Sequence, residues 1–275
     1  MIIKRSVALS ALMLMAACAA PSNDTETAAT ATTDVAVELA AAPGNIETHM
    51  RFLADDALEG REAGTEGYDK AAAYVAAEME KLGVAPAGTD GTYFQTVPLR
   101  RSYRVPDALS FSVTNSETGE DLGFESNVDH VVYGSTRAAE STVSAEAVFV
   151  GFGVVAPDLG RDDYAGLDVE GKIVVMLSGT PKGIQTEERA YYGNRKSAEA
   201  SERGAIGVVT LTTPTRERVY SFARLVGEGR LESARMSWLT ANGETFSRAP
   251  NLQASAGLSL DGGRKLMDAA GQDFD

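Results

Sequence analysis

The sequence predicts a mixed fold of the α+β or α/β class, in which helices come first and a β-rich region follows. Apolar residues recur at helical spacing over residues 46–82, whereas residues 109–113 alternate between apolar and polar, as in a half-buried strand. Residues 173–177 and 205–211 are short apolar runs typical of strands that are buried on both faces. With 275 residues, of which 44% are hydrophobic and 23% charged, the chain can bury a core and has the composition of a folded protein.

Charge and residue counts exclude several classes of function. The chain has 25 basic and 39 acidic residues, a net charge of −14, which argues against nucleic acid as the main partner because phosphate binding requires a basic surface. The two histidines, His49 and His130, leave little room for a His-rich metal site. The single cysteine, Cys18, excludes internal disulfides and Cys-based zinc sites.

Residues 1–17 predict a signal peptide. Two basic residues precede an apolar run of 11 residues, Val7–Ala17. This run is too short to span a bilayer, which requires about 20 apolar residues, but it fits the apolar region of a secretory signal. Small residues then precede Cys18, as in a bacterial lipoprotein processing site, although Met15 stands where that pattern usually has Leu. The alternative is simple removal by the ordinary signal peptidase.

We therefore expect Cys18 to be lipidated and to anchor a secreted protein to a membrane. Ala19 follows the cysteine in place of the Asp of an inner-membrane retention signal, which favours an outer-membrane lipoprotein facing the periplasm or the cell surface. Residues 18–43 are rich in Ala, Thr and acidic residues without a persistent period, which indicates a disordered tether. Loss of Lys4 and Arg5 with the signal peptide takes the net charge from −14 to −16.

A helix, a glycine-containing loop and a second helix are expected over residues 45–88. The first helix has an apolar stripe at helical spacing, formed by Ile46, Met50 and Leu53. Glycines then form a compact loop, and Thr65 can cap the helix that follows. The apolar face of this second helix consists of Ala72, Val75, Met79 and Leu82.

The stretch Leu53–Val84, followed by Gly91–Leu99, resembles the opening of metallopeptidase family 28, the co-catalytic zinc aminopeptidases and their relatives. The matching loop positions are Leu58, Gly60, Arg61, Gly64, Thr65 and Gly67. In that family the segment packs on the α/β peptidase core and does not form the metal site. The resemblance implies that residues 44–102 are the N-terminal part of a peptidase domain, whose substrates are peptides or proteins.

Glu59, Arg61 and Glu62 lie in the same loop and could suggest catalytic groups. No acid–base partner or metal-ligand spacing is visible around them. Salt bridges and hydrogen bonds that hold the loop are therefore the favoured interpretation of these residues.

Residues 103–257 predict a second, strand-rich domain. Beyond the two buried strands, we expect strands over residues 127–133, 145–155, 236–239 and 252–260 and a short helix over 196–203. Val148–Pro157, Asp162–Met176 and Lys196–Leu211 resemble, in this order, segments of the protease-associated domain.

That resemblance implies a β-sandwich or open barrel with short helices, inserted in the peptidase domain. Such a domain has no chemistry of its own and shapes substrate access or mediates protein contacts. Residues 258–275 then resemble the segment that returns from the insert toward the catalytic core. An unrelated α/β binding module is the alternative.

Two acidic groups in this domain could suggest other chemistry. Asp162, Asp163 and Asp168 lack the spacing and the closing Glu of a Ca²⁺ loop, so turn-forming and capping roles are favoured. Glu187 and Glu188 are adjacent, like a glutamate pair of the family's active site, but they lie inside the insert, where no family motif is expected. We do not transfer the family roles to them.

The full-length family holds two zinc ions with two histidines and three carboxylates, and its first histidine belongs to a His-x-Asp motif. His49 is followed by Met50 and Arg51, and His130 by two valines, so neither histidine matches. We therefore expect no catalytic, cofactor-binding or metal-binding residue in this chain and no zinc bound by it. The sequence predicts the N-terminal portion of a secreted, lipid-anchored zinc aminopeptidase, truncated before the metal ligands and inactive by itself.

A non-catalytic surface lipoprotein, with a protease-associated domain that binds proteins or peptides, is the alternative. A Ser-His-Asp hydrolase ranks third, because the chain has no Gly-x-Ser-x-Gly motif and neither histidine has a nucleophile nearby in sequence. If the sheet normally covered by the N-terminal helices is missing, their apolar faces are expected to be exposed or to pack against the insert.

The lipoprotein interpretation predicts that Cys18→Ala abolishes incorporation of labelled palmitate, because the only thiol of the chain is then missing. Labelling of the wild-type chain in the same cells is the control. Undiminished labelling of the variant would contradict lipidation at this residue.

Overall fold

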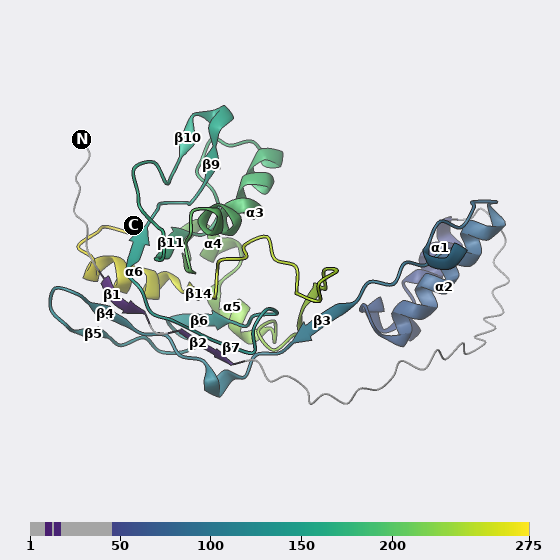
Figure 1. Cartoon of the computed structure of the whole chain (residues 1–275), viewed down its shortest axis with the longest axis horizontal. Coiled ribbons are helices and arrows are strands. Elements are labelled where there is room, and N and C mark those ends of the chain that lie inside the picture. The colour runs from purple at the N-terminus through teal and green to yellow at the C-terminus, as the bar shows by residue number, and fades with distance from the viewer. Residues whose placement is uncertain (1–8, 13, 18–45, 275) are drawn as a thin grey trace. The chain divides into compact units, whose positions relative to one another are not determined.

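The computed structural model describes residues 9–12, 14–17 and 46–274 (Figure 1). The chain divides into two compact units. Unit 1 comprises Met1–Ser22 and Pro98–Asp275, and unit 2 comprises Asn23–Val97. The division at Val97 lies five residues before the boundary that the sequence suggests after residue 102. Both units together give the mixed α and β fold class that the sequence predicts.

Parallel strands form the centre of unit 1. They are β8 (Ala147–Phe149), β11 (Ile173–Leu177), β12 (Gly207–Leu211) and β14 (Ala254–Leu258), and they pair in that order. Both buried strands that the sequence predicts are confirmed as β11 and β12. Their runs of β-branched and aliphatic residues follow from burial on both faces, which leaves no side of the strand for polar residues.

Antiparallel strands extend this sheet at both sides, giving the order β5-β4-β1-β8-β11-β12-β14-β6. These are β1 (Leu9–Leu12), β4 (Val113–Asn115), β5 (Asp121–Leu122) and β6 (His130–Tyr133). A separate pair consists of β2 (Leu14–Ala17) and β7 (Glu140–Val143).

β1 and β2 belong to the residues that we predict to be a signal peptide. Leu9 lies opposite Asn115 of β4 and opposite Ala147 of β8, so the backbone of β1 joins these two strands. An extended apolar segment can fill such a position because the edge of a sheet presents unpaired N–H and C=O groups. The predicted lipidation site Cys18 and the predicted tether, residues 18–43, lie outside the described residues.

Residues near the two edges of the sheet pack together over one core. Phe111, just before β4, stacks on His130 of β6 with ring centroids 4.9 Å apart, although the two strands lie far apart in the strand order. The enclosed core includes Val132, Val175 and Leu211.

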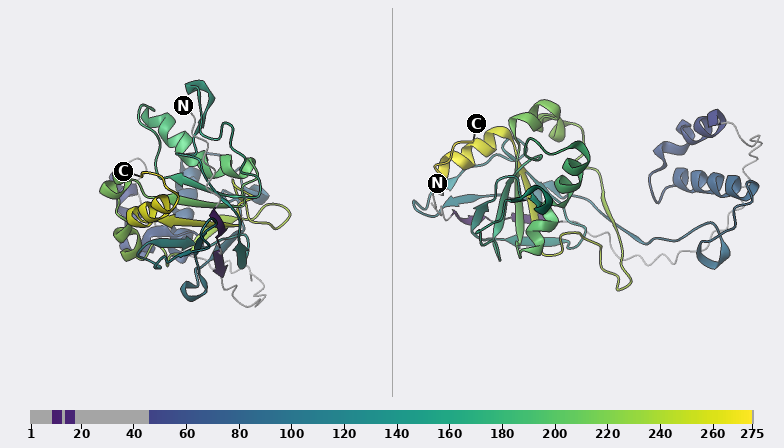
Figure 2. Two further views of the ribbon diagram at one scale, coloured as in Figure 1. Left: turned by 90° about the vertical axis from the view of Figure 1, so that its left-hand side faces the viewer. Right: turned by 90° about the horizontal axis from the view of Figure 1, so that it is seen from above.

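Helix α6 (Leu260–Ala269) closes this core. Its side chains Leu266 and Met267 are buried among the residues of this core, and the Ser259 hydroxyl caps its first turn. Figure 2 shows α6, in yellow, beside the strands of unit 1 in both views. The segment that the sequence suggests as a return toward another domain is therefore part of the core of unit 1.

Helix α3 (Thr186–Glu202) packs on the other face of β11 and β12. Ala200 of this helix lies in a second core cluster with Val174 and Val208. Shorter elements complete the unit: β3 (Leu99–Ser102), a 3-10 turn η3 (Pro106–Ala108), β9 (Val155–Ala156), η4 (Pro157–Leu159), β10 (Arg161–Asp162), α4 (Pro214–Val219), α5 (Phe222–Gly227) and β13 (Arg235–Trp238). Of these, β3 pairs with β13 and β9 pairs with β10, both antiparallel.

Unit 2 is a helix–loop–helix, as the sequence predicts. Its elements are α1 (Ile46–Leu53), η1 (Asp56–Arg61), α2 (Glu66–Lys81) and η2 (Thr89–Gly91). Figures 1 and 2 show α1 and α2 side by side, and Phe52 of α1 stacks on Tyr74 of α2 with centroids 4.1 Å apart. Thr65 caps α2, as expected, by accepting a hydrogen bond from the Tyr68 N–H at 3.4 Å.

Among the described residues, none of the helices combines the length and the apolar character needed to cross a bilayer.

Gly67→Ala is predicted to destabilise unit 2 by about 1–3 kcal/mol. An added Cβ would stand 1.9 Å from the carbonyl oxygen of Leu58, and this backbone atom cannot move without displacing the loop. The clash outweighs the gain of about 1 kcal/mol that Ala normally has over Gly in a helix. Hydrogen exchange of the α1 and α2 amides measures the effect.

Gly227→Ala in α5 is the matched control, because nothing lies within 4 Å of the Cβ position. Equal protection of the unit 2 amides in wild type and Gly67→Ala would contradict the close packing of α2 on the loop.

Candidate functional site

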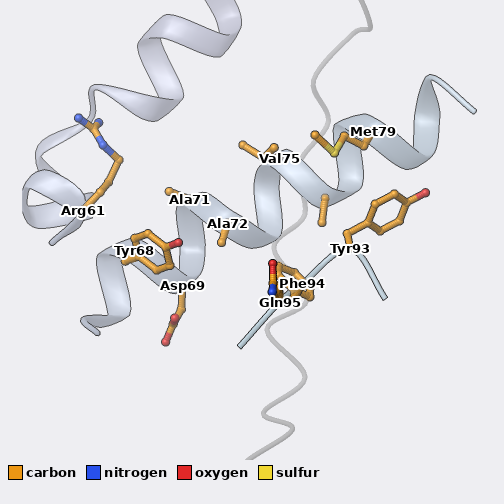
Figure 3. A pocket seen from close by; sticks show the side chains of 11 residues that line it. Arg61, Tyr68, Asp69, Ala71, Ala72, Val75, Met79, Tyr93, Phe94 and Gln95 are labelled. Carbon is orange, nitrogen blue, oxygen red and sulfur yellow. The ribbon is translucent and has the colours of Figure 1, made fainter. Parts of the chain in front are cut away.

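An open, largely apolar pocket on unit 2 is the candidate functional site (Figure 3). Its volume is about 790 Å³. One wall is a face of α2, and the other is the segment Tyr93–Gln95. Arg61 and Asp69 bring opposite charges to its lining.

The helical wall follows from the spacing of the sequence. Because residues three and four apart share a face of a helix, Ala72, Val75 and Met79 form one stripe along α2. Figure 3 shows Val75 and Met79 on this helix with the segment Tyr93–Gln95 nearby.

The second wall is held by a tight turn. The Thr89 N–H donates to the carbonyl oxygen of Phe94 at 2.7 Å, and the Tyr93 hydroxyl donates to the carbonyl oxygen of Val84 at 2.6 Å. Gly88 allows this approach, because a Cβ there would stand 2.2 Å from the Phe94 carbonyl oxygen. The residues that form this wall belong to the Gly91–Leu99 stretch that the family resemblance includes, although sequence reasoning assigned them no role.

The apolar faces of both helices are open to solvent. Val75 and Met79 are each 40% exposed, and Phe94 is 47% exposed. On α1, Ile46 is 76% exposed and Met50 is 65% exposed. Contiguous exposed apolar surface of this kind marks a place where another surface packs.

The loop residues Glu59, Arg61 and Glu62 are all exposed. Glu59 and Arg61 adopt positive φ angles of 48° and 59°, so the loop is held in a conformation that non-glycine residues rarely adopt. The Thr65 hydroxyl donates to the carbonyl oxygen of Glu62 at 2.7 Å, which fixes the junction with α2. Arg61 lines the pocket together with Asp69, a residue that the sequence analysis did not single out.

The two histidines lie in different units and in contacts that suit structural roles. The His49 Nδ1 is 2.6 Å from the Tyr74 hydroxyl. His130 is buried against Phe111, and this burial lowers its pKa below the ordinary value, although Asp129 opposes the shift.

In the described residues, neither histidine belongs to a cluster of carboxylates that could form a dizinc site. The part of the chain that the structure describes holds no group of three or more His, Cys, Asp or Glu residues that could bind a metal ion. The residues present therefore do not fit the family's zinc site, and we assign no chemical step to zinc in this chain. That the chain binds no zinc stays a prediction.

The acidic residues of unit 1 hold turns. Asp162 accepts a hydrogen bond from the Tyr164 N–H, Asp163 from the Val154 N–H, and Asp168 from the Glu170 N–H, at 2.9 to 3.1 Å. These contacts agree with the turn-forming roles favoured over Ca²⁺ binding. Glu187 and Glu188 lie exposed in the first turn of α3, where negative charge suits the helix dipole.

Lys196 is a buried cation that the sequence analysis did not identify. Its Nζ donates to the carbonyl oxygens of Leu177 at 2.6 Å and Gly179 at 2.9 Å, which ties α3 to the end of β11. Burial lowers the pKa of Lys196 to about 8, while Asp163 acts in the opposite direction. Lys196 lies in a stretch that the sequence predicts as a short polar helix, and nothing in that stretch indicates that this lysine is buried.

Comparisons with known proteins show that this chain is distantly similar to a solved aminopeptidase structure. No family model matches the chain, and no curated protein matches it. Among solved structures, an aminopeptidase from Aneurinibacillus sp. strain AM-1 matches with 17% identity and a TM-score of 0.37. The match covers 82% of this chain and 41% of that chain, so this chain spans less than half the length of that aminopeptidase.

The buried Lys196 predicts a pH dependence of stability. Its pKa of about 8 in the folded protein lies below the unfolded value of 10.5, so the unfolded chain binds more protons between these pH values. Stability relative to Lys196→Met should therefore rise with pH across this window, by on the order of 3 kcal/mol in total. Urea unfolding at a series of pH values measures the difference.

Lys182→Met, at an exposed position, is the control and should keep the wild-type slope. The burial argument would fail if Lys196→Met also showed the wild-type slope between pH 8 and 10.5.

Proposed function

We propose that this chain is the N-terminal portion of a secreted, lipid-anchored zinc aminopeptidase, and that unit 2 packs its pocket face against the peptidase core. The observation that carries the proposal is the exposed apolar face of α2 and the adjoining turn, with Val75, Met79 and Phe94 at 40–47% exposure. Burial of apolar surface contributes about 25 cal/mol per Å², so a surface that covers this face gains substantial stability.

The position of the pocket in the sequence supports this assignment. Both walls come from the two stretches, Leu53–Val84 and Gly91–Leu99, that resemble the opening of metallopeptidase family 28. In that family the corresponding segment covers the α/β peptidase core. Arg61 and Asp69 add one charge of each sign to the pocket lining, which would fix the orientation of the docked surface through paired polar contacts.

Under this proposal, the peptide-cleaving groups lie outside this chain. Unit 2 contributes a packing surface, and unit 1 shapes access of peptide substrates to the active site.

A specific observation favours the alternative, a non-catalytic lipoprotein that binds proteins or peptides. Trp238 of β13 stacks on Phe246 with ring centroids 4.7 Å apart, yet the two side chains are 43% and 40% exposed. Leu99 lies opposite Trp238 in the β3–β13 register and is also 43% exposed. Aromatic and aliphatic side chains held in the open by a β-ribbon are typical of protein-binding surfaces.

The gene that encodes the chain provides the first test. Extension of the reading frame beyond residue 275 should encode a His-x-Asp motif and an adjacent pair of glutamates, and the extended product should bind zinc and release N-terminal residues from peptides. Absence of both motifs would overturn the peptidase proposal. Stoichiometric zinc and chelator-sensitive turnover in the 275-residue chain itself would exclude the non-catalytic alternative.

Met79→Glu tests the packing of unit 2. In the extended product, the buried carboxylate should lower the free energy of unfolding by about 2 kcal/mol or more, because an unpaired charge is costly at an apolar interface. In the 275-residue chain, where Met79 borders solvent, the same change should cost about 1 kcal/mol or less. Urea unfolding of both products measures the two values.

Ala73→Glu, at an exposed position of the same helix, is the matched control and should have little effect in either product. Equal costs of Met79→Glu in the two products would count against a packing role for this face.

A further inference from the structure

Arginines are concentrated in two segments of unit 1 that lie side by side. Residues 98–104 and 214–248 together contain nine Arg and four Glu and no other charged residue, whereas the whole chain has a net charge of −14. The two segments are joined by the antiparallel pairing of β3 with β13. These two segments therefore carry a net positive charge, whereas the rest of the protein is acidic.

One of these arginines, Arg235, lies over Tyr133, the last residue of β6, and the charges of two others act on the Tyr133 hydroxyl. The guanidinium of Arg235 lies over the Tyr133 ring, 5.6 Å from its centroid, and donates to the carbonyl oxygen of Gly134 at 3.3 Å. Arg104 and Arg216 come from the end of the β3 segment and from α4. Burial raises the pKa of the Tyr133 hydroxyl, while the charges of Arg235, Arg104 and Arg216 oppose this shift.

These cations have little compensating negative charge. Among the residues that the structure describes, no carboxylate lies within 4.0 Å of the guanidinium nitrogens of Arg104, Arg216 or Arg235. Glu232 is the carboxylate that acts on Arg104 at longer range. Glu228 is already paired with Arg224 and Arg230.

The side chain of Arg104 independently indicates that a hydrogen-bond acceptor is missing. Its Nε is buried and has no hydrogen-bond acceptor, and its burial lowers the pKa of the guanidinium. A buried donor without an acceptor destabilises the fold, and more so when it is charged, unless something binds to it.

The Tyr133 hydroxyl lies at a part of the sheet that suits ligands. The Tyr133 hydroxyl lies over Gly257 of β14, where a Cβ would stand only 2.8 Å away. Gly257 is the penultimate residue of β14, so the hydroxyl lies near the carboxyl end of the parallel strands. Open α/β sheets bind ligands in this region, beyond the carboxyl ends of their strands.

We propose that Arg104, Arg216 and Arg235 form a binding site for a ligand that carries an oxyanion, either a carboxylate or a phosphate, beside the hydroxyl of Tyr133. Guanidinium groups bind both oxyanions through paired N–H donors, and a phenol supplies one further donor. An oxyanion would satisfy the buried Nε of Arg104 and compensate the positive charge. The site lies within unit 1 and does not depend on the peptidase proposal.

Calorimetric titration of the whole chain with inorganic phosphate, and separately with acetate, tests the site at low ionic strength. At least one oxyanion should bind, and added salt should weaken its binding. Binding of phosphate but not acetate assigns a phosphoryl ligand, and the reverse assigns a carboxylate ligand. Absence of binding by both overturns the proposal.

Arg216→Gln should weaken the binding about tenfold or more, because one charge-assisted contact is lost. Arg218→Gln is the matched control on the same helix, since the Arg218 side chain bonds to Thr215 and is not among the groups that act on Tyr133. Equal weakening by both changes, or no weakening by Arg216→Gln, overturns the site. If Arg216→Gln fails to fold by circular dichroism, Arg235→Lys keeps the charge and removes the planar donor pair, with the same expected weakening.

Discussion

The parallel pairing of β11 with β12 and of β12 with β14 is the constraint on which unit 1 depends. The register runs without interruption through five residue pairs at each junction, from Ile173 opposite Gly207 to Leu211 opposite Leu258. Alternate side chains of these strands enter two different cores, one closed by α6 and one covered by α3. Parallel strands require crossover connections, so the helices between them are placed on the sheet by the same pairing.

Unit 2 has no comparable element. The contacts that join its two helices and the loop include the Phe52–Tyr74 stack, the His49–Tyr74 hydrogen bond and the close approach of Gly67 to Leu58. These contacts join α1, the loop and α2 but use only one side of α2. The opposite side of the helix remains apolar and open. Helix α2 therefore has two apolar sides, and unit 2 covers only the side that contains Tyr74.

The elements that the sequence predicts well are those whose burial is continuous. β11 and β12 were evident as apolar runs, and α2 was evident from its cap and its stripe. The strand expected over residues 145–155 is instead two short strands, because Gly151 and Gly153 adopt positive φ angles and turn the chain between them. The helix expected over residues 196–203 begins earlier, at Thr186, since its exposed first turns carry no apolar period.

The candidate sites were less accessible to sequence reasoning, for a physical reason. The cluster around Tyr133 joins residues more than 100 positions apart, and only the β3–β13 pairing brings Arg104 and Arg235 together. From the sequence alone, Lys196 would be placed at the surface. Its burial depends on two carbonyl groups at the end of β11, which only the fold brings to it. By contrast, the apolar faces of α1 and α2 were evident from the helical spacing of their apolar residues.

The position of β1 has a consequence for the proposal of a secreted lipoprotein, under which residues 1–17 are a signal peptide. β1 lies between β4 and β8 as an internal strand, so its backbone is inaccessible to an enzyme that reads an extended peptide. Under that proposal, export and processing would precede closure of this sheet. Removal of β1 would leave β4 and β8 each without one neighbour, and their backbone donors and acceptors would be available to each other or to an incoming strand.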